Sequence, residues 1–153
     1  MAPQTAPGAR IALVDLNRLI RDNRIAEYPS PNLALGMRPL EFGPGTSRWT
    51  WTDQPSAALN PFGLLQGGYL AIFVDELCST AIASVLEERE WSVTAECKIS
   101  YLRALKPGVI AGTAEVIRRS RSLAFLAADL RGADGRIAVQ ASATWAISQP
   151  QSG

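Results

Sequence analysis

Residues 60–88 read NPFGLLQGGYLAIFVDELCSTAIASVLEE, and the rest of the chain is organised around this stretch. A loop rich in proline and glycine leads into Gly67-Gly68, and a long, almost wholly apolar run follows. A helix that is apolar on all sides belongs in a protein core. The acidic pair Asp75-Glu76 interrupts the run, and a carboxylate there is costly unless it is paired, hydrated or functional. The pair is therefore the first candidate for chemistry.

Composition narrows the possible functions. The 153 residues suffice for one domain with a substantial core, and the net charge of +1 gives no attraction to nucleic acid or to a membrane. The apolar run is long enough for a membrane span, but its two central carboxylates favour a buried helix in a cytoplasmic protein. The chain contains no histidine, which excludes Ser-His-Asp and Cys-His catalysis and most histidine metal sites. We expect no metal centre, and any chemistry must use carboxylates, hydroxyls, amides and backbone dipoles.

Hydrophobic periodicity predicts the element order α–β–β–α–β–β–β–β. Helices are expected in residues 10–27 and through the apolar run, and strands in residues 33–42, 47–53, 91–102, 109–119, 123–132 and 136–148. One long apolar helix on an antiparallel meander is α+β architecture. Residues 1–33 would form an extension with a short helix, residues 34–148 the main domain, and residues 149–153 a tail.

Gly67-Gly68 would place free backbone N–H groups at the start of the long helix, where glycine lets a ligand approach closely. This geometry suits a carbonyl oxygen that becomes an oxyanion, although a simple tight turn also explains two glycines. Asp75 lies about 10.5 Å from Gly68 along the helix axis, whereas reacting groups must lie within ~3–3.5 Å. One helix therefore cannot supply both groups. Two helices packed antiparallel about a two-fold axis can, which predicts a homodimer with shared sites.

Two more side chains of the helix need an interpretation. Ser79 lies one turn beyond Asp75, so its hydroxyl would orient the carboxylate or a water molecule, unless Ser79 is only a small packing residue. Glu76 points about 100° away from Asp75, and we expect it at an interface or paired with an arginine. The alternative for Asp75 itself is a buried carboxylate paired with an arginine or a backbone amide.

The run NPFGLLQGGYLAIFVDELCSTAIA resembles the hotdog-fold acyl-CoA thioesterases of the phenylacetate-degradation (PaaI) type. Their signature is N-x-x-G-x-x-H-G-G followed by an aspartate on the long helix, and the matching residues are Asn60, Gly63, Gly67, Gly68 and Asp75. Gln66 replaces the histidine. The segment SVTAECKISYLRALKPG resembles the family's next strand, where Thr94 falls on a hydroxyl position, and RSRSLAFLAADLRGADGRIAVQASAT resembles its closing hairpin. The resemblance covers about residues 34–147.

The resemblance implies a hotdog fold, in which an antiparallel sheet wraps around one long central helix. It also implies that Asp75 is the nucleophile or general base, and that the N–H of Gly68 from the partner chain holds the thioester oxygen. Asn60 would bind or orient the water or the carbonyl, and a hydroxyl, either that of Thr94 or that of Ser79, would position the water. Gln66 can donate a hydrogen bond but cannot carry a proton, so it would keep only an orienting role.

The implied substrate is an aromatic or fatty acyl-CoA, so coenzyme A is part of the substrate and no separate cofactor is expected. Arg103, Arg119 and Arg121 are the candidates to bind the CoA phosphates, unless they are ordinary solvated charges. The implied assembly is a homodimer, with a dimer of dimers giving a homotetramer, and no nucleic-acid or membrane partner. The alternatives are a non-catalytic acyl-CoA-binding hotdog protein, in which Gln66 marks a decayed site, and a hotdog dehydratase, which would need a catalytic histidine.

Overall fold

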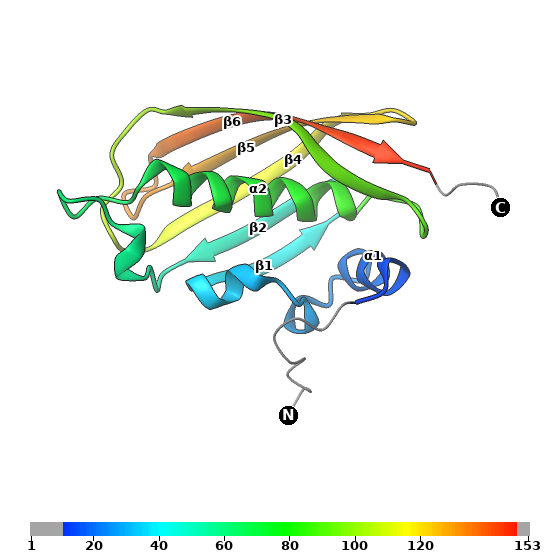
Figure 1. The fold of residues 1–153 in the computed structure, drawn as a ribbon, viewed down its shortest axis with the longest axis horizontal. Helices are drawn as coiled ribbons and strands as arrows, with labels where there is room; N and C mark the ends of the chain where they lie inside the picture. Colours follow the sequence, from blue (N-terminus) through cyan, green and yellow to red (C-terminus); the bar gives the residue numbers. More distant parts are fainter. Residues whose placement is uncertain (1–10, 150–153) are drawn as a thin grey trace.

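The computed structural model describes residues 11–149, and its centre is a six-stranded sheet with one long helix along a face (Figure 1). The strands are β1 (Met37–Gly43), β2 (Thr46–Trp51), β3 (Trp91–Tyr101), β4 (Ile110–Arg119), β5 (Leu123–Arg131) and β6 (Ile137–Ser148). Their order is β1-β2-β4-β5-β6-β3, and every neighbouring pair is antiparallel. The predicted α+β hotdog architecture is confirmed, and it leaves β1 and β3 as the two edge strands.

The helical segments are α1 (Leu13–Arg21), α2 (Gly67–Ala83) and three short 3₁₀ helices, η1 (Ile25–Glu27), η2 (Pro31–Leu35) and η3 (Ser56–Ala58). The predicted order of the main helices and strands is confirmed. The prediction of a strand from residue 33 was wrong at its start, because η2 occupies that stretch and β1 begins at Met37. Ser30 caps η2 by accepting a hydrogen bond from the Asn32 N–H, and Gly36 ends it with a φ of 90°.

The sheet covers one side of α2 and the N-terminal segment covers another, which explains why this helix needs apolar residues on nearly all sides. Phe73, Leu77 and Ile82 have no exposed surface. Gly112 of β4 lies directly under the helix, where a Cβ would come within 2.6 Å of Leu77 Cδ1. The glycine therefore permits the close approach of helix and sheet. Among residues 11–149, no helix is long and apolar enough to cross a membrane, and a cytoplasmic location stays a prediction.

The N-terminal segment belongs to the same core. Leu19 and Ile20 of α1 are buried. The ring of Tyr28 packs edge-on against Phe42 and Trp49, with centroid distances of 5.3 and 5.7 Å. The segment outside the family resemblance thus completes the packing around β1, β2 and α2, and the division of the chain at residue 34 stays a prediction.

Candidate active site

Asp75 is exposed in the middle of α2, although both of its chain neighbours are buried. Its Oδ1 accepts a hydrogen bond of 2.6 Å from the Thr94 hydroxyl of β3. Thr94 faces α2 because it stands opposite Trp145 of β6, which is buried, and opposed residues of an antiparallel pair share a face. No arginine or lysine of residues 11–149 forms an ion pair with Asp75, so within these residues Asp75 is not the buried, arginine-paired carboxylate of the alternative interpretation. The second carboxylate oxygen remains available to a substrate or a water molecule.

Gly68 presents open backbone at the start of α2. It is exposed, and a Cβ on it would meet no atom within 4 Å. The first N–H groups that bond back to the Gln66 carbonyl are those of Tyr69 and Leu70, at 3.1 and 3.2 Å. The Gly68 N–H therefore has no hydrogen-bond acceptor among residues 11–149, as the geometry of a helix start requires.

Gly67 has a packing role, which differs from the role expected of Gly68. The Tyr101 hydroxyl donates a hydrogen bond of 2.8 Å to the Gly67 carbonyl oxygen, and a Cβ on Gly67 would lie 3.1 Å from the tyrosine ring. Gly67 thus lets the end of β3 lie against the start of α2. Sequence reasoning missed this role of Tyr101, because nothing in the local pattern indicates which residue lies over the first glycine.

Gln66 uses its side-chain amide to hold the preceding loop. Its Nε2 donates to the carbonyl oxygens of Ala57 and Leu59, at 3.1 and 3.0 Å. Both protons of the amide nitrogen are therefore engaged, and the side chain offers a ligand only the acceptor Oε1. In this conformation Gln66 would orient a donor, such as water, rather than a carbonyl oxygen.

Asn60 also orders this loop. Its Oδ1 accepts hydrogen bonds from the N–H groups of Phe62 and Leu64, at 2.9 and 3.1 Å. Because the oxygen is occupied, the Nδ2 group is what Asn60 can offer to a carbonyl or a water. Its predicted role in orienting substrate stays a prediction that only this amide nitrogen can fulfil.

Glu76 turns away from Asp75 and lies buried beneath the N-terminal segment. Asn32 Nδ2 donates a hydrogen bond to Glu76 Oε2. Burial raises the pKa of the Glu76 carboxyl, and interactions with the side chains of Tyr28, Asn32 and Ser30 offset part of that rise. No arginine among residues 11–149 forms an ion pair with Glu76, so the prediction of an arginine partner was wrong for these residues, and the alternative of an interface position stays a prediction. The partners come from residues more than forty positions away, which helical spacing cannot reveal.

Ser79 lies close enough to Tyr28 for their side chains to interact. No hydrogen bond joins Ser79 to Asp75 within the described residues. The structure therefore brings Thr94, rather than Ser79, into contact with the carboxylate. A role for Ser79 in positioning water stays a prediction.

The three arginines predicted to bind CoA phosphates lie in different places. Arg103 follows β3 at the end of the sheet where α2 begins (Figure 1). Arg119 ends β4 and Arg121 lies in the β4–β5 turn, at the opposite end of the sheet. Arg119 forms an ion pair with Glu90, which is buried. Burial acts to raise the pKa of Glu90, but hydrogen bonds from the Glu87 N–H and Gln149, together with Arg119, outweigh it and lower the pKa. Arg119 is thus part of the packing, and its contact with CoA stays a prediction.

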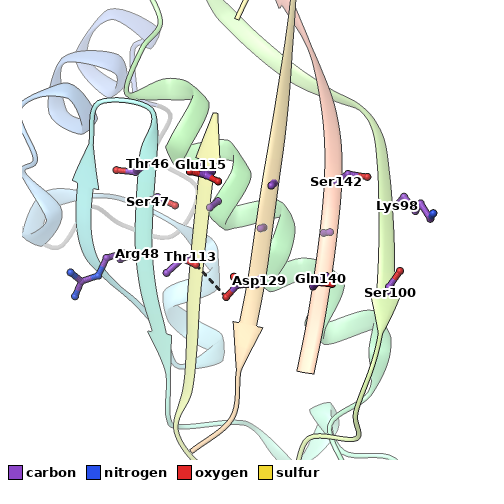
Figure 2. Close-up of a pocket in the computed structure, with 14 residues that line it drawn as sticks. Thr46, Ser47, Arg48, Lys98, Ser100, Thr113, Glu115, Asp129, Gln140 and Ser142 are labelled. Carbon is purple, nitrogen blue, oxygen red and sulfur yellow. Dashed lines mark hydrogen bonds between the residues drawn. The ribbon is translucent and has the colours of Figure 1, made fainter. Parts of the chain in front are cut away.

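A hollow of about 760 Å³ lies on the sheet face opposite α2 (Figure 2). Its polar side chains include Thr113, Asp129, Gln140 and Ser142, and none of the predicted catalytic residues lines it. The candidate catalytic groups lie on the other side of the sheet. There, Gly68, Ile72 and Asp75 form an exposed stripe along the otherwise mostly buried α2.

The model of the thioesterase superfamily matches residues 62–139, more than half of the chain, and this range contains Gly68, Asp75 and Thr94. The chain belongs to the thioesterase superfamily. No curated protein sequence matches this superfamily member.

Solved structures share the fold. The PaaI protein from the phenylacetic acid degradation operon of E. coli has a TM-score of 0.76 at 20% identity, covering 88% of this chain and 96% of its own. A putative thioesterase from Ralstonia eutropha, described as phenylacetic acid degradation-related, has a TM-score of 0.75 at 25% identity, covering 86% and 98%. A mutant thioesterase from Pseudomonas aeruginosa has a TM-score of 0.71 at 25% identity, covering 92% and 96%. The predicted resemblance to PaaI-type hotdog thioesterases is confirmed.

Proposed function

We propose that this superfamily member hydrolyses the thioester of an aromatic or fatty acyl-CoA, with Asp75 as the catalytic carboxylate. The observation that carries the proposal is the exposed Asp75 in an otherwise mostly buried helix, with one oxygen held by Thr94 at 2.6 Å. Thr94 fixes the orientation of the carboxylate and leaves its other oxygen free. A carboxylate in this state can attack a thioester carbon or take a proton from water.

Both chemical routes require the same groups. As a general base, Asp75 takes a proton from water while the water oxygen bonds to the carbonyl carbon. The tetrahedral intermediate then expels the CoA thiolate, to which Asp75 returns the proton. As a nucleophile, an Asp75 oxygen bonds to the carbonyl carbon and expels the CoA thiolate, which takes a proton from water; water then hydrolyses the acyl anhydride, which releases the acid and regenerates the carboxylate. In each route the carbonyl oxygen gains negative charge, and an unpaired N–H at a helix start stabilises it; Gly68 has such an N–H.

The site would be completed by a second copy of the chain. Gly68, Ile72 and Asp75 are exposed along α2, and β3 beside them is an edge strand that, within residues 11–149, pairs only with β6. An exposed helix stripe next to an unpaired strand edge is a surface that a symmetric partner can cover. With the two α2 helices antiparallel, Asp75 of one protomer would face Gly68 of its partner. A homodimer, able to pair further into a dimer of dimers, is therefore part of the proposal.

A thiol-release assay on a panel of aromatic and fatty acyl-CoAs tests the activity. We expect CoA release well above the rate in buffer for at least one member of the panel, and the best substrate identifies the acyl group. Rates equal to buffer on every thioester would overturn the proposal. Acyl-CoA binding without turnover would instead support the alternative of a non-catalytic acyl-CoA-binding protein.

Shared sites predict complementation between two inactive variants. Asp75→Ala removes the carboxylate, and Gly68→Pro removes the N–H at a helix start, where proline is tolerated. After subunit exchange, half of the dimers would be mixed and each would hold one intact site, so we expect activity to recover to roughly a quarter of wild type. The measurement is CoA release before and after exchange.

Gly68→Ala is the matched control for this experiment, because it keeps the N–H and its Cβ would meet no atom within 4 Å. It should remain active on its own. If exchange is verified, both single variants are folded by circular dichroism, and no activity returns, the shared-site arrangement is wrong.

A further inference from the structure

A second hollow, of about 570 Å³, lies where β3 ends, and three arginines line it. They are Arg103, which follows β3, Arg131 at the end of β5, and Arg136 just before β6. Gln140 lines this hollow as well as the one in Figure 2, so the two adjoin on the sheet. Three guanidinium groups around one hollow stand out in a chain whose net charge is only +1.

The positive charge of this arginine hollow is only partly neutralised. Arg131 is held in place, since its Nε lies 3.2 Å from Asp129 Oδ1 and its Nη1 donates to the Gly135 carbonyl oxygen at 3.0 Å. Arg103 and Arg136 are exposed, and neither forms an ion pair with a carboxylate of residues 11–149. Neighbouring like charges without counter-charges create a positive potential that an anion would relieve.

The arginine hollow lies at the same end of the molecule as the proposed oxyanion donor. Arg103 follows Tyr101 by two residues, so their Cα atoms are no more than about 7 Å apart, and Tyr101 contacts Gly67 at the start of α2. The N–H groups of Leu102 and Arg103 both donate to the Ala138 carbonyl oxygen, at 2.8 and 3.2 Å. These bonds fix the position of residues 102–103, which connect the end of β3, near the start of α2, to the arginine hollow.

We infer that Arg103, Arg131 and Arg136 together bind the phosphates of the 3′-phospho-ADP portion of coenzyme A. Guanidinium groups bind phosphate oxygens through paired, charge-assisted hydrogen bonds. The inference rests on the proposed function, because it assigns the phosphate-bearing end of the same substrate. It adds Arg131 and Arg136 to the predicted Arg103, and it places the nucleotide away from Arg119 and Arg121.

Calorimetric titration with adenosine 3′,5′-bisphosphate tests this binding site without requiring hydrolysis. We expect Arg103→Ala and Arg136→Ala each to weaken binding about tenfold, since each removes charged hydrogen bonds. Arg118→Ala is the matched control, because Arg118 is also exposed but lies at the opposite end of β4; it should bind like wild type. Unchanged affinity in both hollow variants, or equal weakening in the control, would overturn the inference.

Kinetics separate the nucleotide from the rest of the substrate. In the same two variants we expect the KM for acyl-CoA to rise about tenfold at unchanged kcat, and the KM for the same acyl group on pantetheine, which has no phosphate, to stay constant. An equal KM increase with acyl-4′-phosphopantetheine would place the single pantetheine phosphate in the hollow instead and would overturn the nucleotide assignment. If the protein binds the nucleotide through these arginines but hydrolyses no thioester, the proposed function is wrong and the nucleotide site stands. If both variants hydrolyse acyl-CoA with an unaltered KM, the assignment of the nucleotide to the arginine hollow is wrong and the proposed function stands.

Discussion

Replacing Asp75 by asparagine should lower kcat for acyl-CoA hydrolysis by about 10²-fold or more, with a much smaller change in KM. Asparagine has nearly the same shape, and its side-chain oxygen can still accept the hydrogen bond that Thr94 donates to Asp75. It can neither take a proton from water nor attack the thioester as a carboxylate does. The loss would therefore measure the chemistry of the carboxylate rather than a change in the fold. Initial rates of thiol release across substrate concentrations give both constants.

Glu76→Gln is the matched control for Asp75→Asn, because it makes the same chemical change at the next residue of α2. Glu76 is 7% exposed and is hydrogen-bonded by Asn32, so its replacement should leave kcat near that of wild type. Burial raises the pKa of Glu76, which means that this site disfavours a charged carboxylate, and glutamine carries no charge. A wild-type kcat for Asp75→Asn would exclude this residue as the catalyst. An equally large loss in Glu76→Gln would point to a disturbance of the helix instead.

Replacing Arg119 by alanine should lower the free energy of unfolding by about 3 kcal/mol. Arg119 forms an ion pair with Glu90, which is 4% exposed, so the substitution would leave a buried carboxylate without its cation. The Glu90 side chain also accepts hydrogen bonds from Gln149 and from the Glu87 N–H, at 2.6 and 2.8 Å. These bonds connect the segment before β3 to the C-terminal end of β6, so we expect the substitution to destabilise the whole sheet. Urea denaturation followed by circular dichroism measures the change.

Arg118→Ala serves again as the control, since Arg118 precedes Arg119 on β4 and is exposed. It should unfold at the same urea concentration as wild type, because an exposed arginine contributes little to stability. Equal stability of Arg119→Ala and Arg118→Ala would show that the ion pair contributes nothing. An Arg119→Ala protein of unchanged stability but raised KM for acyl-CoA would revive the sequence-based assignment of Arg119 to the phosphates.

Most of the helices and strands could be predicted from local patterns in the sequence. The strands after α2 could be predicted because alternating residues and turn signals report a half-buried sheet directly. One exception was residues 33–35, which were expected to begin a strand but belong to the 3₁₀ helix that Ser30 caps. This helix begins with a side-chain capping hydrogen bond from the Asn32 N–H to Ser30, which a window of hydrophobic residues does not record. Another exception was residues 22–24, which were expected to be helical, although α1 ends at Arg21 and η1 begins at Ile25.

Part of the candidate site could likewise be predicted from the sequence, and the other part only the tertiary structure reveals. Helical geometry relates residues a few positions apart, so the sequence alone determined that Asp75 and Gly68 lie along one helix, too far apart to act on one carbonyl. The tertiary structure alone decided that Thr94 meets Asp75, that Asn32 covers Glu76 and that Arg119 is committed to Glu90. It also gathered the arginine hollow from three segments. Each of these contacts joins residues far apart in the chain, and only strand register and the path of the N-terminal segment bring them together.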